Sequence, residues 1–180
     1  KERKTWKWVG IGFGLMYGLN MIYSIIGDSI EAFSLSGTST WTTKVTGGVG
    51  NKLAIDNEHG IYSLNANKTL YRYDLIDGSE SKFTDLAVTS GILIGSDGNV
   101  YFASNNIFYA LDCDGNILWK SKLDSNITGN PIMDKNGIIY INGANKVYAL
   151  GKASLNDPDL SIEAEDIYAD QMETIIVNIM

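Results

Sequence analysis

Short apolar runs and turn-forming residues alternate along most of this chain. The clearest stretch reads YFASNNIFYALDCDGNILW, and its pattern predicts three short strands over residues 100–104, 107–112 and 116–120. Between the last two strands stands Asp114-Gly115, a dipeptide that accepts the positive φ values of a tight hairpin turn. Nowhere do apolar residues recur every 3.6 residues over a long stretch, as an amphipathic helix would require. The pattern therefore predicts an all-β protein.

The strand pattern repeats along the chain with a period of about 39 residues. Four tyrosines in β-rich runs are each 39 residues apart: Tyr23, Tyr62, Tyr101 and Tyr140. A second set follows nine or ten residues after each tyrosine, spaced by 40, 38 and 39 residues: Ala32, Arg72, Ala110 and Ala149. Such a period is typical of an array in which one supersecondary unit recurs.

A glycine turn followed by tryptophan completes the repeat unit. The spacings are five and four residues in both the first and the third unit, which contain Ala32, Gly37 and Trp41, and Ala110, Gly115 and Trp119. The second unit keeps the turn at Asp77-Gly78 but has Lys82-Phe83 where tryptophan would stand. The fourth unit shows neither turn nor tryptophan after Leu150, which we interpret as the end of the array.

About four short strands for every 39 residues is the length of a β-propeller blade. One blade cannot bury both of its faces, so neighbouring blades must cover one another. We therefore interpret the repeated tyrosines and tryptophans as packing residues between blades. Stacking of a ligand on these rings is the alternative.

Composition and charge restrict the partners. With a net charge of −7 and a pI near 4.6, the chain lacks the basic face that a nucleic acid requires. Residues 9–26 carry no charge and follow the basic KERK, so they could form a signal peptide or membrane anchor. A strand is favoured instead, because this stretch contains glycines at 10, 12, 14 and 18 and keeps the spacing of the 39-residue repeat.

The residues that carry chemistry are few. Cys113 is the single cysteine and His59 the single histidine, so neither has a like residue for a disulfide, a metal site or a triad. Residues 112–116, DCDGN, are too short for a twelve-residue calcium loop, and a hairpin turn explains them better. We predict no catalytic residue, no cofactor and no metal.

The unit IYxxxxxxxYALDxDGxxLW resembles the repeat of pyrroloquinoline-quinone-type propellers over residues 21–152. The resemblance rests on the spacing of Ala110, Asp112, Gly115 and Trp119, and the first unit has Ser34 in place of the aspartate. That superfamily includes quinoprotein alcohol dehydrogenases, the propeller lipoprotein of outer-membrane protein assembly, and many secreted surface proteins. The resemblance implies that the tryptophan lies on the outer strand and docks against the adjoining blade.

The same resemblance implies what a dehydrogenase would need: calcium or a lanthanide, a catalytic aspartate and a tryptophan over the quinone. No carboxylate stands out as a base in this sequence, and the turn is one residue shorter than is typical of the dehydrogenases. The shorter turn resembles that of the non-enzymatic surface relatives.

The sequence predicts three segments. Residues 1–152 form a partial β-propeller with repeats near 10–50, 51–90, 91–130 and 131–152, and the polar residues 153–159 form a linker. Residues 160–180 are expected to begin a truncated immunoglobulin-like sandwich, because they alternate at Ile175, Val177 and Ile179 and are similar to domains that follow such propellers.

These observations predict a non-enzymatic propeller segment of an exported protein, extracellular or in the cell envelope. It would act in adhesion or as a scaffold for a protein or carbohydrate surface partner, and would meet a membrane only through an anchor. Two alternatives stay open: a fragment of a quinone-dependent dehydrogenase, and an envelope-assembly scaffold that captures peptide strands on blade edges.

Overall fold

The computed structural model describes residues 13–16, 21–56, 58–144, 146–151 and 174–177. All regular elements in these residues are β-strands, which confirms the predicted all-β class. Within this described part, no helix is long and apolar enough to cross a membrane. The chain divides into two compact units, residues 1–67 with 71–81 and residues 68–70 with 82–180. The division falls within two strands of the second sheet.

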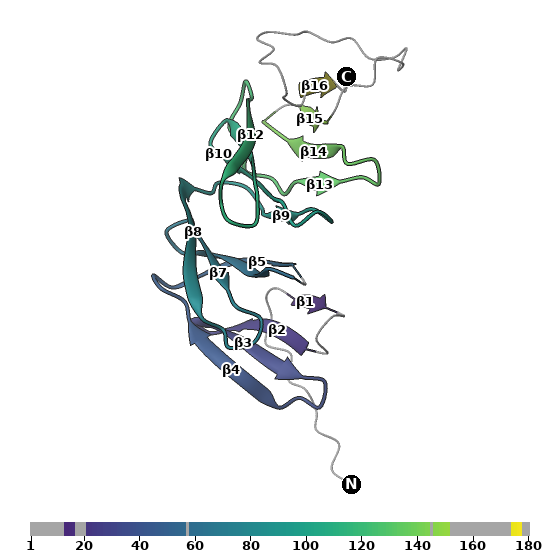
Figure 1. The fold of residues 1–180 in the computed structure, drawn as a ribbon. Helices are drawn as coiled ribbons and strands as arrows, with labels where there is room; N and C mark the ends of the chain where they lie inside the picture. Colours follow the sequence, from purple (N-terminus) through teal and green to yellow (C-terminus); the bar gives the residue numbers. More distant parts are fainter. Residues whose placement is uncertain (1–12, 17–20, 57, 145, 152–173, 178–180) are drawn as a thin grey trace. The chain divides into compact units, whose positions relative to one another are not determined.

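The first sheet is an antiparallel meander in the order β1-β2-β3-β4 (Figure 1). Its strands are β1 (Phe13–Met16), β2 (Met21–Ile26), β3 (Ser29–Ser34) and β4 (Ser39–Lys44). β1 and β2 lie within the uncharged N-terminal stretch and confirm its interpretation as strand for these residues. Residues 9–12 and 17–20 of that stretch lie outside the described residues.

The second sheet has the order β5-β6-β7-β8. Its strands are β5 (Val49–Asp56), β6 (Gly60–Asn65), β7 (Thr69–Tyr73) and β8 (Glu80–Ala87). Every residue of β6 is buried, whereas β8 alternates toward its end between partly buried and exposed residues. The second strand of the sheet is therefore covered on both faces, and the last strand is an exposed edge.

The third sheet contains the clearest sequence repeat. Its strands are β9 (Leu93–Ile94), β10 (Val100–Ser104), β11 (Ile107–Leu111) and β12 (Ile117–Lys122). They pair antiparallel in sequence order. The three strands expected from the pattern at residues 100–120 are confirmed, with boundary differences of two residues or fewer.

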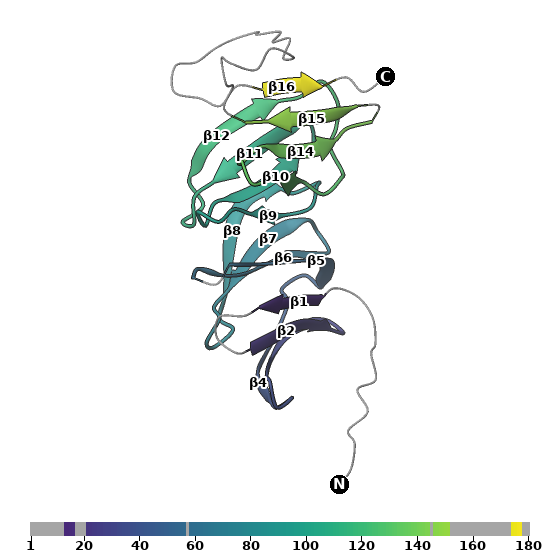
Figure 2. The same ribbon diagram turned by 90° about the vertical axis from the view of Figure 1, so that its right-hand side faces the viewer.

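The fourth sheet includes a strand from the C-terminal segment. Its strands are β13 (Ile132–Met133), β14 (Ile139–Asn142), β15 (Val147–Leu150) and β16 (Thr174–Val177). β16 lies beside β15 in both ribbon views and pairs with it antiparallel (Figures 1 and 2). The strand that we expected in a separate sandwich therefore completes the fourth sheet. The proposed linker, residues 153–159, lies outside the described residues.

Each unit has an apolar core to which two successive sheets contribute. In the first unit, Tyr23, Ile30 and Ala32 pack with Ile61 and Tyr73 of the second sheet. In the second unit, residues of the third sheet pack with residues of the fourth in the same way. Because one face of every sheet needs a neighbour, the repeat is stable only as an array.

In the second sheet, the turn between the third and fourth strands must bring the backbone close to an aromatic ring. Gly78 in the β7–β8 turn has φ of +71°, and a Cβ there would lie 2.7 Å from Cδ2 of Trp41. Gly27 in the β2–β3 turn also has a positive φ, of +61°, but no atom lies within 4 Å of its Cβ position. A side chain at Gly27 would therefore add only backbone strain, whereas a side chain at Gly78 would add steric overlap as well.

We expect Gly78→Ala to lower the free energy of unfolding by about 2–4 kcal/mol, because it adds overlap with Trp41 to the strain of a left-handed residue. Gly27→Ala, in the same unit, should cost only about 1 kcal/mol from strain alone. Urea unfolding followed by tryptophan fluorescence measures both. Equal losses for the two variants would contradict the close packing of the turn on the ring.

Candidate functional site

Three repeat positions of the first sheet form a row across adjacent strands. Tyr23 on β2 is the cross-strand partner of Ala32 on β3, which in turn is the partner of Trp41 on β4. Ala32 is fully buried, and the rings on either side of it meet with centroids 5.9 Å apart. A larger side chain at the central position would hold the two rings apart.

The third sheet contains the same row. Tyr101, Ala110 and Trp119 are successive cross-strand partners, and the tyrosine and tryptophan centroids are 6.0 Å apart. Phe108 adds a stacked contact with Trp119 at 5.9 Å. In both sheets the register shifts directly after the alanine, where the strand bends into the glycine turn.

The first row binds the β7–β8 turn of the second sheet. The backbone carbonyl of Leu75 accepts hydrogen bonds from Nε1 of Trp41 and from the hydroxyl of Tyr23, each at 3.2 Å. Burial, and then the nearby Asp74 carboxylate, raises the pKa of Tyr23. The polar atoms of these two aromatic side chains are thus directed at a backbone carbonyl of the neighbouring sheet.

The other two sheets vary this arrangement. Tyr62 is fully buried, and Phe83 stands where the tryptophan would be. The carbonyl oxygen of Phe83 lies 2.7 Å from the Cβ position of Gly115, so its strand also approaches a glycine turn. In the fourth sheet Tyr140 pairs with Ala149 but is only half-buried.

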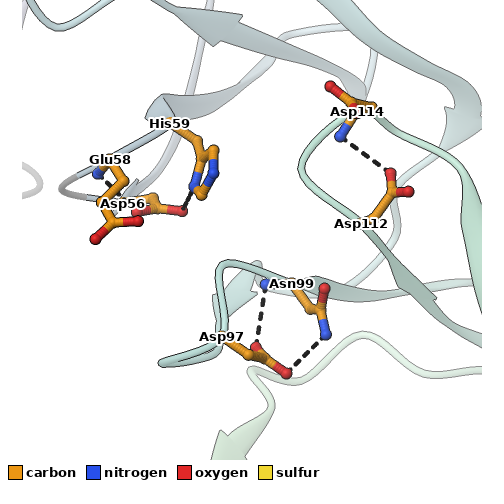
Figure 3. A network of polar contacts seen from close by, with 7 residues as sticks. All are labelled: Asp56, Glu58, His59, Asp97, Asn99, Asp112 and Asp114. Carbon is orange, nitrogen blue, oxygen red and sulfur yellow. Dashed lines mark hydrogen bonds and ion pairs between the residues drawn. The ribbon is translucent and has the colours of Figure 1, made fainter.

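Glycines at the repeat positions allow tight turns that polar side chains close. Gly37 and Gly115 have φ of +81° and +87°. In the third sheet the Asp112 carboxylate accepts a hydrogen bond from the backbone amide of Asp114 at 3.0 Å (Figure 3). It accepts a second from the backbone amide of Asn116 at 2.8 Å. The Asn116 side chain donates another at 2.9 Å, and these bonds lower the pKa of Asp112.

Two more carboxylates of Figure 3, those of Asp97 and Asp56, also accept hydrogen bonds within their own turns. Asp97 accepts hydrogen bonds from the backbone amide and the side-chain amide of Asn99, at 3.1 and 2.6 Å. Asp56 accepts one from the amide of Glu58 at 2.9 Å, and Nδ1 of His59 lies 2.6 Å from its other oxygen. Among the described residues, no three His, Cys, Asp or Glu side chains are grouped to hold a metal ion.

The single cysteine and the single histidine both lie in turns between strands. Cys113 is partly buried within the β11–β12 turn. His59 is partly buried in the turn between β5 and β6, next to Asp56.

Sequence reasoning missed an exposed apolar feature. Leu35 in the β3–β4 turn is 62% exposed, and Ile76 in the β7–β8 turn is 82% exposed. Both belong to the first unit and precede the turn glycine of their sheet. For Leu35, a large apolar residue among the small and polar residues of the turn was the available signal.

Four-stranded antiparallel sheets that cover one another through a repeated tyrosine, alanine and tryptophan define the class: an array of β-propeller blades. The family model described as outer membrane protein assembly factor BamB matches residues 27–156. The chain therefore belongs to this family of pyrroloquinoline-quinone-type propeller repeats. No curated protein sequence matches significantly.

Solved structures show the same fold. BamB from Moraxella catarrhalis aligns with a TM-score of 0.55 and 14% identity, over 72% of this chain and 45% of that one. A protein of unknown function from Bacteroides caccae has a TM-score of 0.50 at 14% identity, over 77% and 54%. The computationally designed Ika8 protein has a TM-score of 0.59 at 15% identity, over 86% and 49%. The chain spans about half the length of these structures.

We expect the Asp112 carboxylate to titrate below its usual value near 4, because three hydrogen bonds stabilise its charged form. Since the folded-state pKa is depressed, the stabilisation is complete above the unfolded pKa and is lost as pH falls through the folded one. Carbon-detected NMR titration measures this pKa directly. Asp112→Asn should remove the corresponding pH dependence of stability, and a normal Asp112 pKa would contradict the turn geometry.

Proposed function

We propose that this chain is a non-enzymatic propeller scaffold of the cell envelope that binds a protein partner. The observation that carries the proposal is the match of residues 27–156 to the family of the outer membrane protein assembly factor BamB. A protein of that description acts on other proteins, which favours a protein partner over a carbohydrate. The acidic charge of −7 agrees with a partner other than a nucleic acid.

The exposed apolar residues of the first unit supply the contact. We define the turn surface as Leu35 and Ile76, which lie in equivalent turns of the first and second sheets. The β7–β8 turn is bonded to Trp41 on β4, and β4 begins directly after the turn that contains Leu35. Trp41 thus bonds to one of these turns and follows the other along the chain, and we propose that the two apolar side chains meet one partner.

The hydrogen bonds made by the polar side chains of the turns favour a scaffold role over a catalytic role for this chain. The Asp112 and Asp97 carboxylates accept hydrogen bonds from amides of their own turns, an arrangement that shapes the backbone. A catalytic base would instead need to reach a substrate proton within hydrogen-bonding distance. Adhesion at a cell surface would use the same kind of scaffold and is the second candidate function. It rests on the resemblance of the sequence repeat to that of secreted surface proteins.

An unfolded outer-membrane β-barrel polypeptide, labelled with a fluorophore, is the probe for the assembly proposal. We expect it to bind the purified chain, and Leu35→Asp with Ile76→Asp to weaken binding roughly tenfold because charge replaces apolar contact. Fluorescence anisotropy measures the affinity. The control is Leu118→Asp, an apolar residue 47% exposed on β12 and outside the turn surface, which should bind as the parent does.

Retention on cell-wall polysaccharide without any binding of the polypeptide would overturn the assembly proposal in favour of adhesion. Equal weakening by Leu118→Asp would show that the turn surface is not the contact.

A further inference from the structure

The connection between β12 and β13 contains a motif that the proposed scaffold role does not use. Residues 123–131 join the two strands, and within them Asn126-Ile127-Thr128 has the form Asn-x-Ser/Thr. This tripeptide is the acceptor motif for attachment of a glycan to asparagine when it lies on the surface of an exported protein. Whether the motif can be used depends on how the connection presents it.

The middle residue of the motif is held in the interior. The Ile127 side chain is fully buried in the core of the second unit. Its backbone amide donates a hydrogen bond to the carbonyl of Asn105 at 2.8 Å, and its carbonyl accepts one from the hydroxyl of Thr89 at 2.9 Å. The side chain and the backbone of Ile127 thus fix the centre of the motif.

The two residues that precede the motif are also held. The Tyr148 hydroxyl donates a hydrogen bond to the Asp124 carboxylate and lies 2.9 Å from the Ser125 hydroxyl. The Lys146 ammonium donates to the same carboxylate. Because Tyr148 is fully buried on β15, these bonds attach the connection to the fourth sheet. The chain is therefore anchored on both sides of Asn126.

The outer two residues of the motif are exposed. Asn126 and Thr128 lie at the surface on either side of the buried Ile127. Alternating exposure is typical of an extended segment, in which residues two positions apart lie on the same side. The acceptor amide and the hydroxyl that the motif requires are therefore presented together. A glycan on Asn126 would displace no core residue.

The chain contains a second motif of this form, Asn67-Lys68-Thr69, whose geometry differs. Asn67 is exposed, but its Nδ2 lies 3.3 Å from the Cβ position of Gly47, so the acceptor nitrogen lies against the backbone of another turn. Lys68 has a left-handed φ of +64°, and Thr69 is partly buried at the start of β7. The amide and the hydroxyl are therefore not presented together in this motif.

We propose that Asn126 is the acceptor of an N-linked glycan, with a lipid-phosphate-linked oligosaccharide as the donor. The inference rests on the proposed envelope location, because the motif is used on exported chains. In the transfer, a bond forms between Nδ2 of Asn126 and C1 of the donor sugar, and the bond between C1 and the donor phosphate breaks. The phosphate leaves with the electron pair, and the amide proton passes to a base of the transferase.

Peptide mass spectrometry of the full chain, isolated from the envelope of its own host, tests the inference. We expect a glycan on the peptide that contains Asn126 and an unmodified peptide for Asn67. Asn126→Gln should abolish the modification, as should Thr128→Val, which removes the hydroxyl and keeps the size of the side chain. Thr128→Ser keeps the hydroxyl and should keep the glycan. Asn67→Gln is the matched control, and circular dichroism confirms that all variants fold.

A second arm separates the acceptor site from the natural location of the chain. The chain is secreted by a eukaryotic host behind a heterologous signal peptide, so that it meets an oligosaccharide transferase. We expect an endoglycosidase to lower the mass of the secreted parent chain and to leave Asn126→Gln unchanged.

An unmodified Asn126 on chain recovered from the envelope overturns the inference and leaves the proposed function standing. Recovery of the chain from the cytoplasm alone overturns the proposed function. The secreted chain then tests the acceptor site by itself, and an unmodified Asn126 there overturns it. Equal modification of Asn67 and Asn126 would contradict the role given to the geometry of the two motifs.

Discussion

The structure depends on a small residue between two large ones. Ala32 and Ala110 each lie between a tyrosine and a tryptophan on adjacent strands, and the absence of bulk lets those rings meet at about the distance of favourable aromatic pairs. A sheet with this row presents a continuous aromatic surface, which must be buried. The next sheet buries it, and the array follows from that requirement.

The glycine turn is the other half of the same contact. Trp41 can rest on the β7–β8 turn only because Gly78 has no Cβ, and its indole then donates to the Leu75 carbonyl. The second sheet shows that the tryptophan is replaceable, since it has Phe83 at this position and the carbonyl of Phe83 approaches Gly115 of the third sheet closely. Close backbone approach at the glycine is thus common to both contacts, whereas the identity of the aromatic residue varies.

Function in such an array is expected on the turns, because the sheets are occupied with one another. Asp112 and Asp97 accept hydrogen bonds from backbone amides of their own turns and so stabilise those turns. Leu35 and Ile76 instead extend from equivalent turns into solvent, where they contribute nothing to the core. Their exposure supports protein binding as the proposed role of the scaffold.

The sequence by itself determined the strands, the turns and the tyrosine-to-alanine spacing, because these depend on neighbours a few residues apart. The nine-residue separation of Tyr23 from Ala32 is the length of a hairpin, and it makes them cross-strand partners. Only the tertiary structure showed that Thr174–Val177 completes the fourth sheet beside β15. It also decided which apolar side chains are exposed. Pairing across a long connection and burial both depend on residues distant in sequence, and a local hydrophobic pattern carries no information about them.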